Sequence, residues 1–159
     1  MVLDERVRST DPPWITLCAL GPERHPESLV SPPAGFAVRL IDGRRCATKR
    51  DLFCEFARAM EFPSYFGQNW DAFEELLADL SWLPAAGYII LVTDAEHVLV
   101  RDDRDYATFL DVLETAGREW AAPPAGVRPR PPVPFHVIFT VAAENVAKRT
   151  DWRLVPHAC

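Results

Sequence analysis

Four carboxylates lie within nine residues of this chain, at a spacing that places them on one side of a helix. They are Asp71, Glu74, Glu75 and Asp79. A helix brings residues three and four positions apart onto the same face, so these side chains would form one acidic surface. Most such surfaces simply face solvent, but an acidic face on a small domain also complements a basic cleft on another protein.

The negative charge of the chain is concentrated around these residues. Residues 59–100 contain seven carboxylates and neither lysine nor arginine, whereas the whole protein has a formal net charge of −6. The other residues therefore sum to about +1. The acidic balance argues against direct binding to nucleic acid or to an anionic membrane.

A metal ion is a second use for the same carboxylates. Asp71 and Glu75 are four residues apart and could face one cation, with His97 as a more distant ligand. The chain has no HExxH, GxGxxG, GxxxxGK[ST] or GxSxG motif. Without a nucleophile, base or cofactor signature, a non-enzymatic docking role that needs no cofactor or metal is favoured. A metal-dependent hydrolase stays open as an alternative.

Two predicted helices and the segment between them would position the acidic surface. Thr48 is a candidate N-cap for a helix that ends near Met60, and Asn69 is a candidate N-cap for a helix over 70–80. The apolar positions of the second helix fall opposite its carboxylates; they are Trp70, Phe73, Leu76, Leu77 and Leu80. This helix should bury its aromatic rings and display its acids.

Strand patterns alternate with these helices. Residues 36–41, 88–92 and 135–141 are predicted strands, 94–100 a short helical turn and 101–120 a longer helix. The run 88–92 is apolar throughout, which is typical of a parallel strand buried on both faces. We expect an α/β fold of three layers, a small three-stranded parallel sheet flanked by helices, with residues 14–20 as a candidate extra strand.

The 159 residues are expected to form one domain with additions. The domain would span 35–141, after a proline-rich extension over 1–34 and before a polar tail over 142–159. Residues 121–134 contain six prolines and are predicted to form an extended loop inserted in the domain.

The compartment expected from the sequence is the cytoplasm. The chain lacks an apolar run of the ~20 residues that a membrane-spanning helix needs, and its first residues lack the apolar core of a signal peptide. The four cysteines show no CxxC pair or zinc spacing, so no disulfide framework is expected. Cys54 is predicted to be a small core residue.

Residues 62–77 resemble the signature of the barstar family, small intracellular inhibitors of secreted ribonucleases such as barnase. The family pattern is a proline, a tyrosine-rich pair, glycine, an acid or amide, asparagine, an apolar residue, aspartate and alanine, with a second acid four residues after the aspartate. It is matched by Pro63, Tyr65, Gly67, Asn69, Asp71 and Ala72, with Glu75 as the second acid. The resemblance extends over about residues 35–141, where the order of predicted elements also agrees.

The resemblance implies a face that plugs the basic active site of a ribonuclease. Glu75 is expected to insert deepest as a phosphate mimic, whereas Gly67 and Asn69 are expected to shape the loop. Glu75 stands where the family usually has aspartate, and Glu74 where barstar itself has an aromatic residue. A third acid of the family aligns with Ala107, and Asp105 is close enough to replace it. The expected partner-binding residues are Tyr65, Phe66, Gly67, Asn69, Asp71, Glu74, Glu75 and Asp105.

Two identities for the partner follow from these features. The first is a secreted or toxin-type ribonuclease with a basic active site. The second is another basic protein, such as a toxin nuclease, for which a repurposed barstar-like fold would serve as an interaction module or an immunity protein. The sequence does not determine the oligomeric state.

Overall fold

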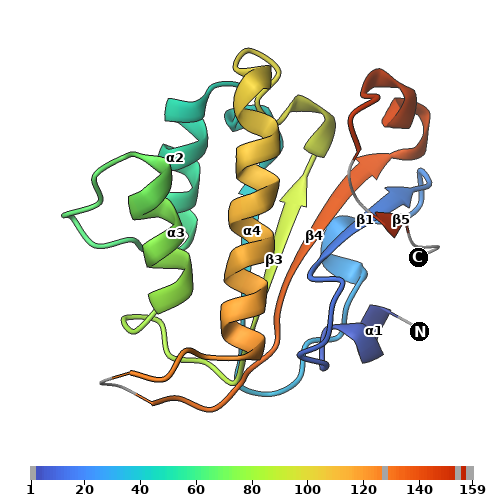
Figure 1. Ribbon diagram of the computed structural model, residues 1–159. Coiled ribbons are helices and arrows are strands. Elements are labelled where there is room, and N and C mark those ends of the chain that lie inside the picture. The colour runs from blue at the N-terminus through green and yellow to red at the C-terminus, as the bar shows by residue number, and fades with distance from the viewer. Residues whose placement is uncertain (1–2, 127–128, 153–154, 157–159) are drawn as a thin grey trace.

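The computed structural model describes residues 3–126, 129–152 and 155–156 (Figure 1). The helices and strands are α1 (Leu3–Arg6), β1 (Ile15–Leu20), β2 (Phe36–Asp42), α2 (Lys49–Ala59), α3 (Trp70–Asp79), β3 (Gly87–Thr93), α4 (Tyr106–Ala121), β4 (Phe135–Ala142) and β5 (Val155–Pro156). Short 3-10 helices lie between them: η1 (Pro26–Ser28), η2 (Gly43–Arg45), η3 (Ala95–His97), η4 (Asp103–Asp105) and η5 (Ala143–Lys148).

The strands form one parallel sheet in the order β2-β3-β4-β1-β5. The three strands expected for the domain are adjacent in it as β2, β3 and β4. The candidate N-terminal strand is β1, which pairs with β4 so that Ile15 lies opposite Val137 and Leu20 opposite Ala142. The predicted α/β fold is confirmed; in the described part of the chain the sheet contains, beside the three expected strands, the candidate strand β1 and the two-residue β5, which was not predicted.

Both faces of the sheet are covered. Helices α2, α3 and α4 pack on one face, as Figure 1 shows, and α1 packs on the other. Side chains of β3 alternate between the two cores: Ile90 points toward the three helices, whereas Ile89 and Leu91 contact the cluster that contains Leu3 and Val7. The continuous apolar run of β3 therefore serves two cores. Within the described residues, no helix combines the length and apolar character needed to cross a bilayer.

Local side-chain contacts mark where α2 begins, and α4 begins later than predicted. Thr48 Oγ1 accepts a hydrogen bond from the Asp51 N–H at 3.1 Å, which confirms the predicted N-cap of α2. The helix predicted from residue 101 begins later, at Tyr106, after the 3-10 turn η4. Asp102 is not helical, with φ −130° and ψ 53°, and its carboxylate accepts the Lys49 N–H at 2.7 Å at the first turn of α2.

One expectation about the cysteines is wrong. Cys54 is exposed, because α2 buries Leu52, Phe53 and Phe56 and position 54 falls on the opposite side of the helix. Cys46 is the buried free thiol, and burial raises its pKa to about 12, with Glu55 acting in the same direction. Cys18 is disulfide-bonded, and this one bond does not test the expectation that the fold has no disulfide framework.

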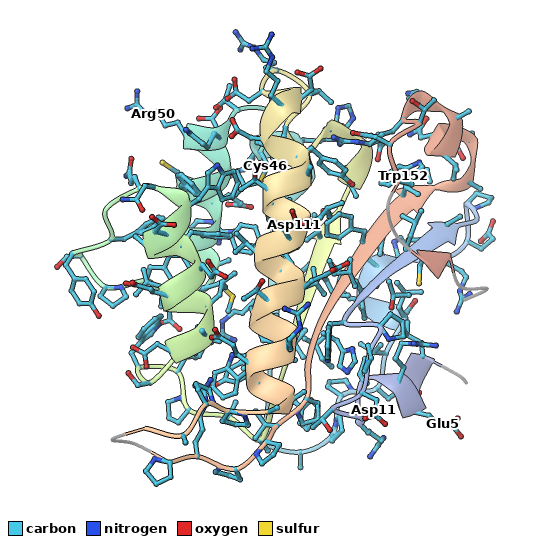
Figure 2. The ribbon with its side chains drawn as sticks, viewed as in Figure 1. Glu5, Asp11, Cys46, Arg50, Asp111 and Trp152 are labelled. Atoms are coloured by element: carbon cyan, nitrogen blue, oxygen red, sulfur yellow. The ribbon has the colours of Figure 1, made fainter. Side chains whose placement is uncertain are left out.

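Residues after β4 are anchored to the domain by two side chains. Arg149 is buried, with its guanidinium carbon 3.6 Å from the centre of the Tyr106 ring. Trp152, whose side chain Figure 2 marks, packs against the main core, and its indole N–H donates to the Val146 carbonyl within the same segment at 3.0 Å. Residues 153–154 and 157–159 of the tail lie outside the described residues, and the division into extension, domain and tail stays a proposal.

Stability should fall in mild acid because of His136, which is buried in β4 with Nε2 2.6 Å from the Ser9 carbonyl. Burial lowers the pKa of His136, the Ser9 hydrogen bond opposes this, and nearby Arg6 adds to it. Below about pH 6.5 the unfolded chain then binds more protons than the folded one, so the free energy of unfolding decreases.

Urea titrations at about pH 7.5 and 5.5 measure this effect of His136 protonation. His136→Gln should show a flatter pH dependence, whereas His25→Gln, at an exposed position, should keep that of the wild type. Equal slopes in all three proteins would contradict the assignment to His136.

Candidate functional site

The helix α3 presents its carboxylates to solvent, as its pattern predicted. Asp71, Glu75 and Asp79 are exposed and Glu74 is half-buried, whereas Phe73 on the opposite side is fully buried. None of the four acids forms an ion pair with another described side chain. The helix therefore carries a negatively charged surface whose carboxylates form no ion pair with a described side chain.

The other acids of residues 59–100 are held by the fold. Glu61 pairs with Arg39 at 3.2 Å, and Asp94 pairs with Arg44 at 3.4 Å. Glu96 is buried and accepts a hydrogen bond from the Asn145 amide at 3.0 Å. In the folded protein, the carboxylates of residues 59–100 that keep no such side-chain partner are therefore those of α3.

The two aromatic residues of the preceding loop point in different directions. Tyr65 is 73% exposed. Phe66 is half-buried, and its ring centre lies 5.1 Å from that of Phe62 and 5.5 Å from that of Phe53. Tyr65 is available to a partner, whereas Phe66 holds the loop against the core. Sequence reasoning placed both on the binding face, because nothing local distinguishes two adjacent rings.

Gly67 and Asn69 form a small hydrogen-bonded unit at the start of α3. Asn69 Oδ1 accepts the Ala72 N–H at 2.8 Å, which confirms the predicted N-cap, and Asn69 Nδ2 donates to the Gly67 carbonyl at 3.4 Å. A Cβ at position 67 would lie 3.2 Å from that same nitrogen, a tight contact. These contacts support a loop-shaping role for both residues.

Replacing Asn69 with alanine should lower the free energy of unfolding by about 0.5–2 kcal/mol, because the first turn of α3 loses its side-chain acceptor. Asn69→Asp is the matched control, since aspartate keeps the acceptor and suits the positive end of the helix dipole. Urea titration of both variants measures the difference. Equal stability losses in the two variants would contradict the capping assignment.

Asp105 lies beside the first turn of α3, although 34 residues separate it from Asp71 in the sequence. Its Oδ1 accepts the indole N–H of Trp70 at 3.1 Å, and the side chain is half-buried just before α4. The hydrogen bond joins the beginnings of α3 and α4. Asp105 therefore engages the site through Trp70, and one of its oxygens is already occupied.

A cluster of aromatic rings beneath the site fixes the loop and the helix together. Phe73 is fully buried at its centre. Edge-to-face and tilted ring pairs of this kind add specificity to apolar burial. The ring centres within 6.5 Å of Phe73 are those of Phe53, Phe56, Phe62, Phe66, Trp70 and Phe109.

A groove of about 950 Å³ continues the acidic surface toward the proline-rich segment 121–134. Figure 1 shows that segment, between α4 and β4, passing below the end of α3. The acids of α3 form one wall, Tyr88 and Trp120 line the interior, and described residues of 123–133 form the opposite wall. Sequence reasoning missed the groove because it treated the proline-rich segment as an addition. Trp120, three residues before Pro123, was the available signal.

The described residues contain no arrangement of side chains that supports the metal-dependent alternative. In that part, no three histidine, cysteine, aspartate or glutamate side chains gather as a set that could hold a metal ion. His97 lies beside Glu96, with 3.8 Å between its Nε2 and the carboxylate.

Two comparisons with known proteins complete the description of the site. A family model described as Barstar (barnase inhibitor) matches residues 36–140, which run from β2 to the later part of β4. That range contains the loop 62–69, α3 and the proline-rich segment. A comparison with curated proteins finds no match.

Proposed function

Because this chain belongs to the Barstar (barnase inhibitor) family, we propose that it binds a basic ribonuclease and covers the active site of that enzyme. The family is one of inhibitors, so the chain is proposed to catalyse nothing and to need no cofactor. The observation that carries the proposal is the exposed acidic side of α3 beside the exposed ring of Tyr65.

The proposed mechanism is substitution of carboxylates for the phosphates of RNA. A ribonuclease binds phosphate with cationic side chains, and arginine binds a carboxylate in the same planar, bidentate way. Glu75 follows Asp71 by about one helical turn, so both side chains can reach the same cleft. Their field also accelerates encounter with a basic partner.

The other expected site residues take supporting roles in this proposal. Tyr65 supplies apolar contact area and a hydroxyl at the edge of the interface. Glu74, half-buried, extends the acidic wall toward the groove. Phe66, Gly67 and Asn69 set the shape of the loop, and Asp105 holds Trp70 at the start of α3.

A second candidate partner is a toxin nuclease, against which this chain would act as an immunity protein. The groove beside α3 favours it, because the proline-rich wall gives this chain a contact surface beyond the loop and helix of the signature.

Fractionation of the producing cell tests the cytoplasmic location that either role assumes.

The function is tested by titrating the purified protein against small basic ribonucleases, including those of its own source, and measuring RNA cleavage. Stoichiometric inhibition that weakens with added salt is expected. No inhibition of any enzyme would overturn the ribonuclease assignment and leave the toxin nuclease to be tested by capture.

The metal-dependent alternative predicts a higher melting temperature with Mg²⁺, Mn²⁺ or Zn²⁺.

A further inference from the structure

We propose that the groove between α3 and the proline-rich segment, whose acidic wall includes Asp71 and Glu75, takes an arginine side chain of the partner. The inference rests on the proposed function in one respect, which is that the partner is a basic protein. It adds to the proposed function a second contact region, the groove, and a preference for arginine over lysine there.

The groove already holds a guanidinium group from its own chain. The guanidinium carbon of Arg130 lies 3.5 Å from the centre of the Trp120 ring, and Arg130 Nη1 donates to the Asp79 carbonyl at 3.3 Å. Trp120 is held in place, because it is buried and its indole N–H donates to the Leu77 carbonyl at 2.8 Å. A fixed indole face beside a carbonyl suits a planar guanidinium better than a compact ammonium.

Among the described residues that line the groove, negative charges outnumber positive ones. Among the described lining residues, Arg130 is the cation, and the five carboxylates are Asp71, Glu74, Glu75, Asp79 and Glu119. Burial also lowers the pKa of Arg130, which shows that its charge is partly withdrawn from water. A second cation is therefore attracted to a site where one guanidinium already fits.

The size and stiffness of the groove allow such an occupant. Its volume of about 950 Å³ is near the upper end of the range of about 300–1,000 Å³ found for ligand pockets. Pro123, Pro124, Pro129 and Pro131 line one wall. Because the proline ring fixes φ, these residues lose little conformational freedom when a partner binds. The arginine of the partner would compete with Arg130 for the Trp120 face and the acidic wall.

NMR titration of the full-length protein with hexa-arginine and hexa-lysine peptides tests this site. Hexa-arginine should shift the indole signal of Trp120 and the backbone signal of Val133, and hexa-lysine should shift them less. Arg130→Ala should bind hexa-arginine about tenfold more tightly than wild type, because the internal competitor is gone. Arg50→Ala is the control: it removes the same charge at an exposed position of α2, which Figure 2 marks far from the groove, and should match wild type.

Two outcomes would overturn the proposal. One is an equal gain in affinity for Arg130→Ala and Arg50→Ala, which would show a general charge effect. The other is a set of shifts confined to the start of α3, with none at Trp120 or Val133. Arg130→Gln, which keeps a hydrogen-bond donor of similar length, should behave as Arg130→Ala does and guards against a local folding defect in either variant.

The result separates this inference from the proposed function. Ribonuclease inhibition that depends on Asp71 and Glu75 but is unchanged in Arg130→Ala would overturn the groove and leave the inhibitor role standing. Hexa-arginine binding at Trp120 in a protein that inhibits no ribonuclease would support the groove and overturn the inhibitor role alone.

Discussion

Charge reversal of Asp71 and Glu75 together, Asp71→Lys with Glu75→Lys, should abolish binding to the target ribonuclease and leave the protein folded. Each carboxylate is expected to make charge-assisted hydrogen bonds worth about 1.5–3 kcal/mol. Loss of both predicts an affinity at least about 100-fold weaker, and the new lysines would in addition repel the cationic cleft. Inhibition titrations and calorimetry of the variant measure the loss.

The folding cost of this double reversal is small. Both side chains are exposed and neither forms an ion pair with a described residue. Asp71 lies in the first turn of α3, where a lysine opposes the helix dipole by about 0.3–1 kcal/mol. The variant should therefore unfold in urea at a concentration close to that of the wild type.

A matched reversal on the far side of the molecule controls for net charge. Glu5→Lys with Asp11→Lys makes the same change in charge at exposed positions, and Figure 2 shows both residues on the side away from α3. This control should lose association rate only modestly, through the weaker overall field. If the α3 variant inhibits as strongly as the control, the acidic face of α3 is not the binding surface.

Truncation of Phe73 to alanine should lower the free energy of unfolding by about 3–5 kcal/mol, the usual cost of deleting a fully buried ring. The ring is the centre of the cluster that joins α2, α3, α4 and the loop. Its removal leaves a cavity that the surrounding rings cannot all close. Urea or thermal unfolding measures the change, and ribonuclease inhibition should weaken as the loop loses its support.

Two comparisons isolate the contribution of the Phe73 ring. Phe73→Leu keeps most of the buried volume and should cost less than Phe73→Ala. Tyr65→Ala removes an exposed ring from the same loop and should change stability by no more than about 0.5 kcal/mol. A stability loss for Phe73→Ala no larger than that for Tyr65→Ala would contradict the central position of Phe73 in the core.

Short-range sequence patterns predicted most of the helices and strands. The caps at Thr48 and Asn69, the two-sided helix α3 and the doubly buried strand β3 were all predicted, because each depends on residues a few positions apart. The partner of β1 was not predicted. Alternation of apolar residues marks a strand, but the choice of β4 as its neighbour depends on packing across more than 100 residues of sequence.

The features of the candidate site also fall into those that the sequence predicted and those that only the structure revealed. The sequence by itself determined the acidic side of α3, the signature around it and the loop that precedes it. Only the tertiary structure decided that Phe66 turns inward, that Asp105 reaches Trp70, and that Arg130 stacks on Trp120 beside a groove. Helical periodicity and capping are short-range properties that a sequence displays directly. Contacts such as Trp70 with Asp105 depend on how separate elements pack, and packing is settled by the shape of the whole core.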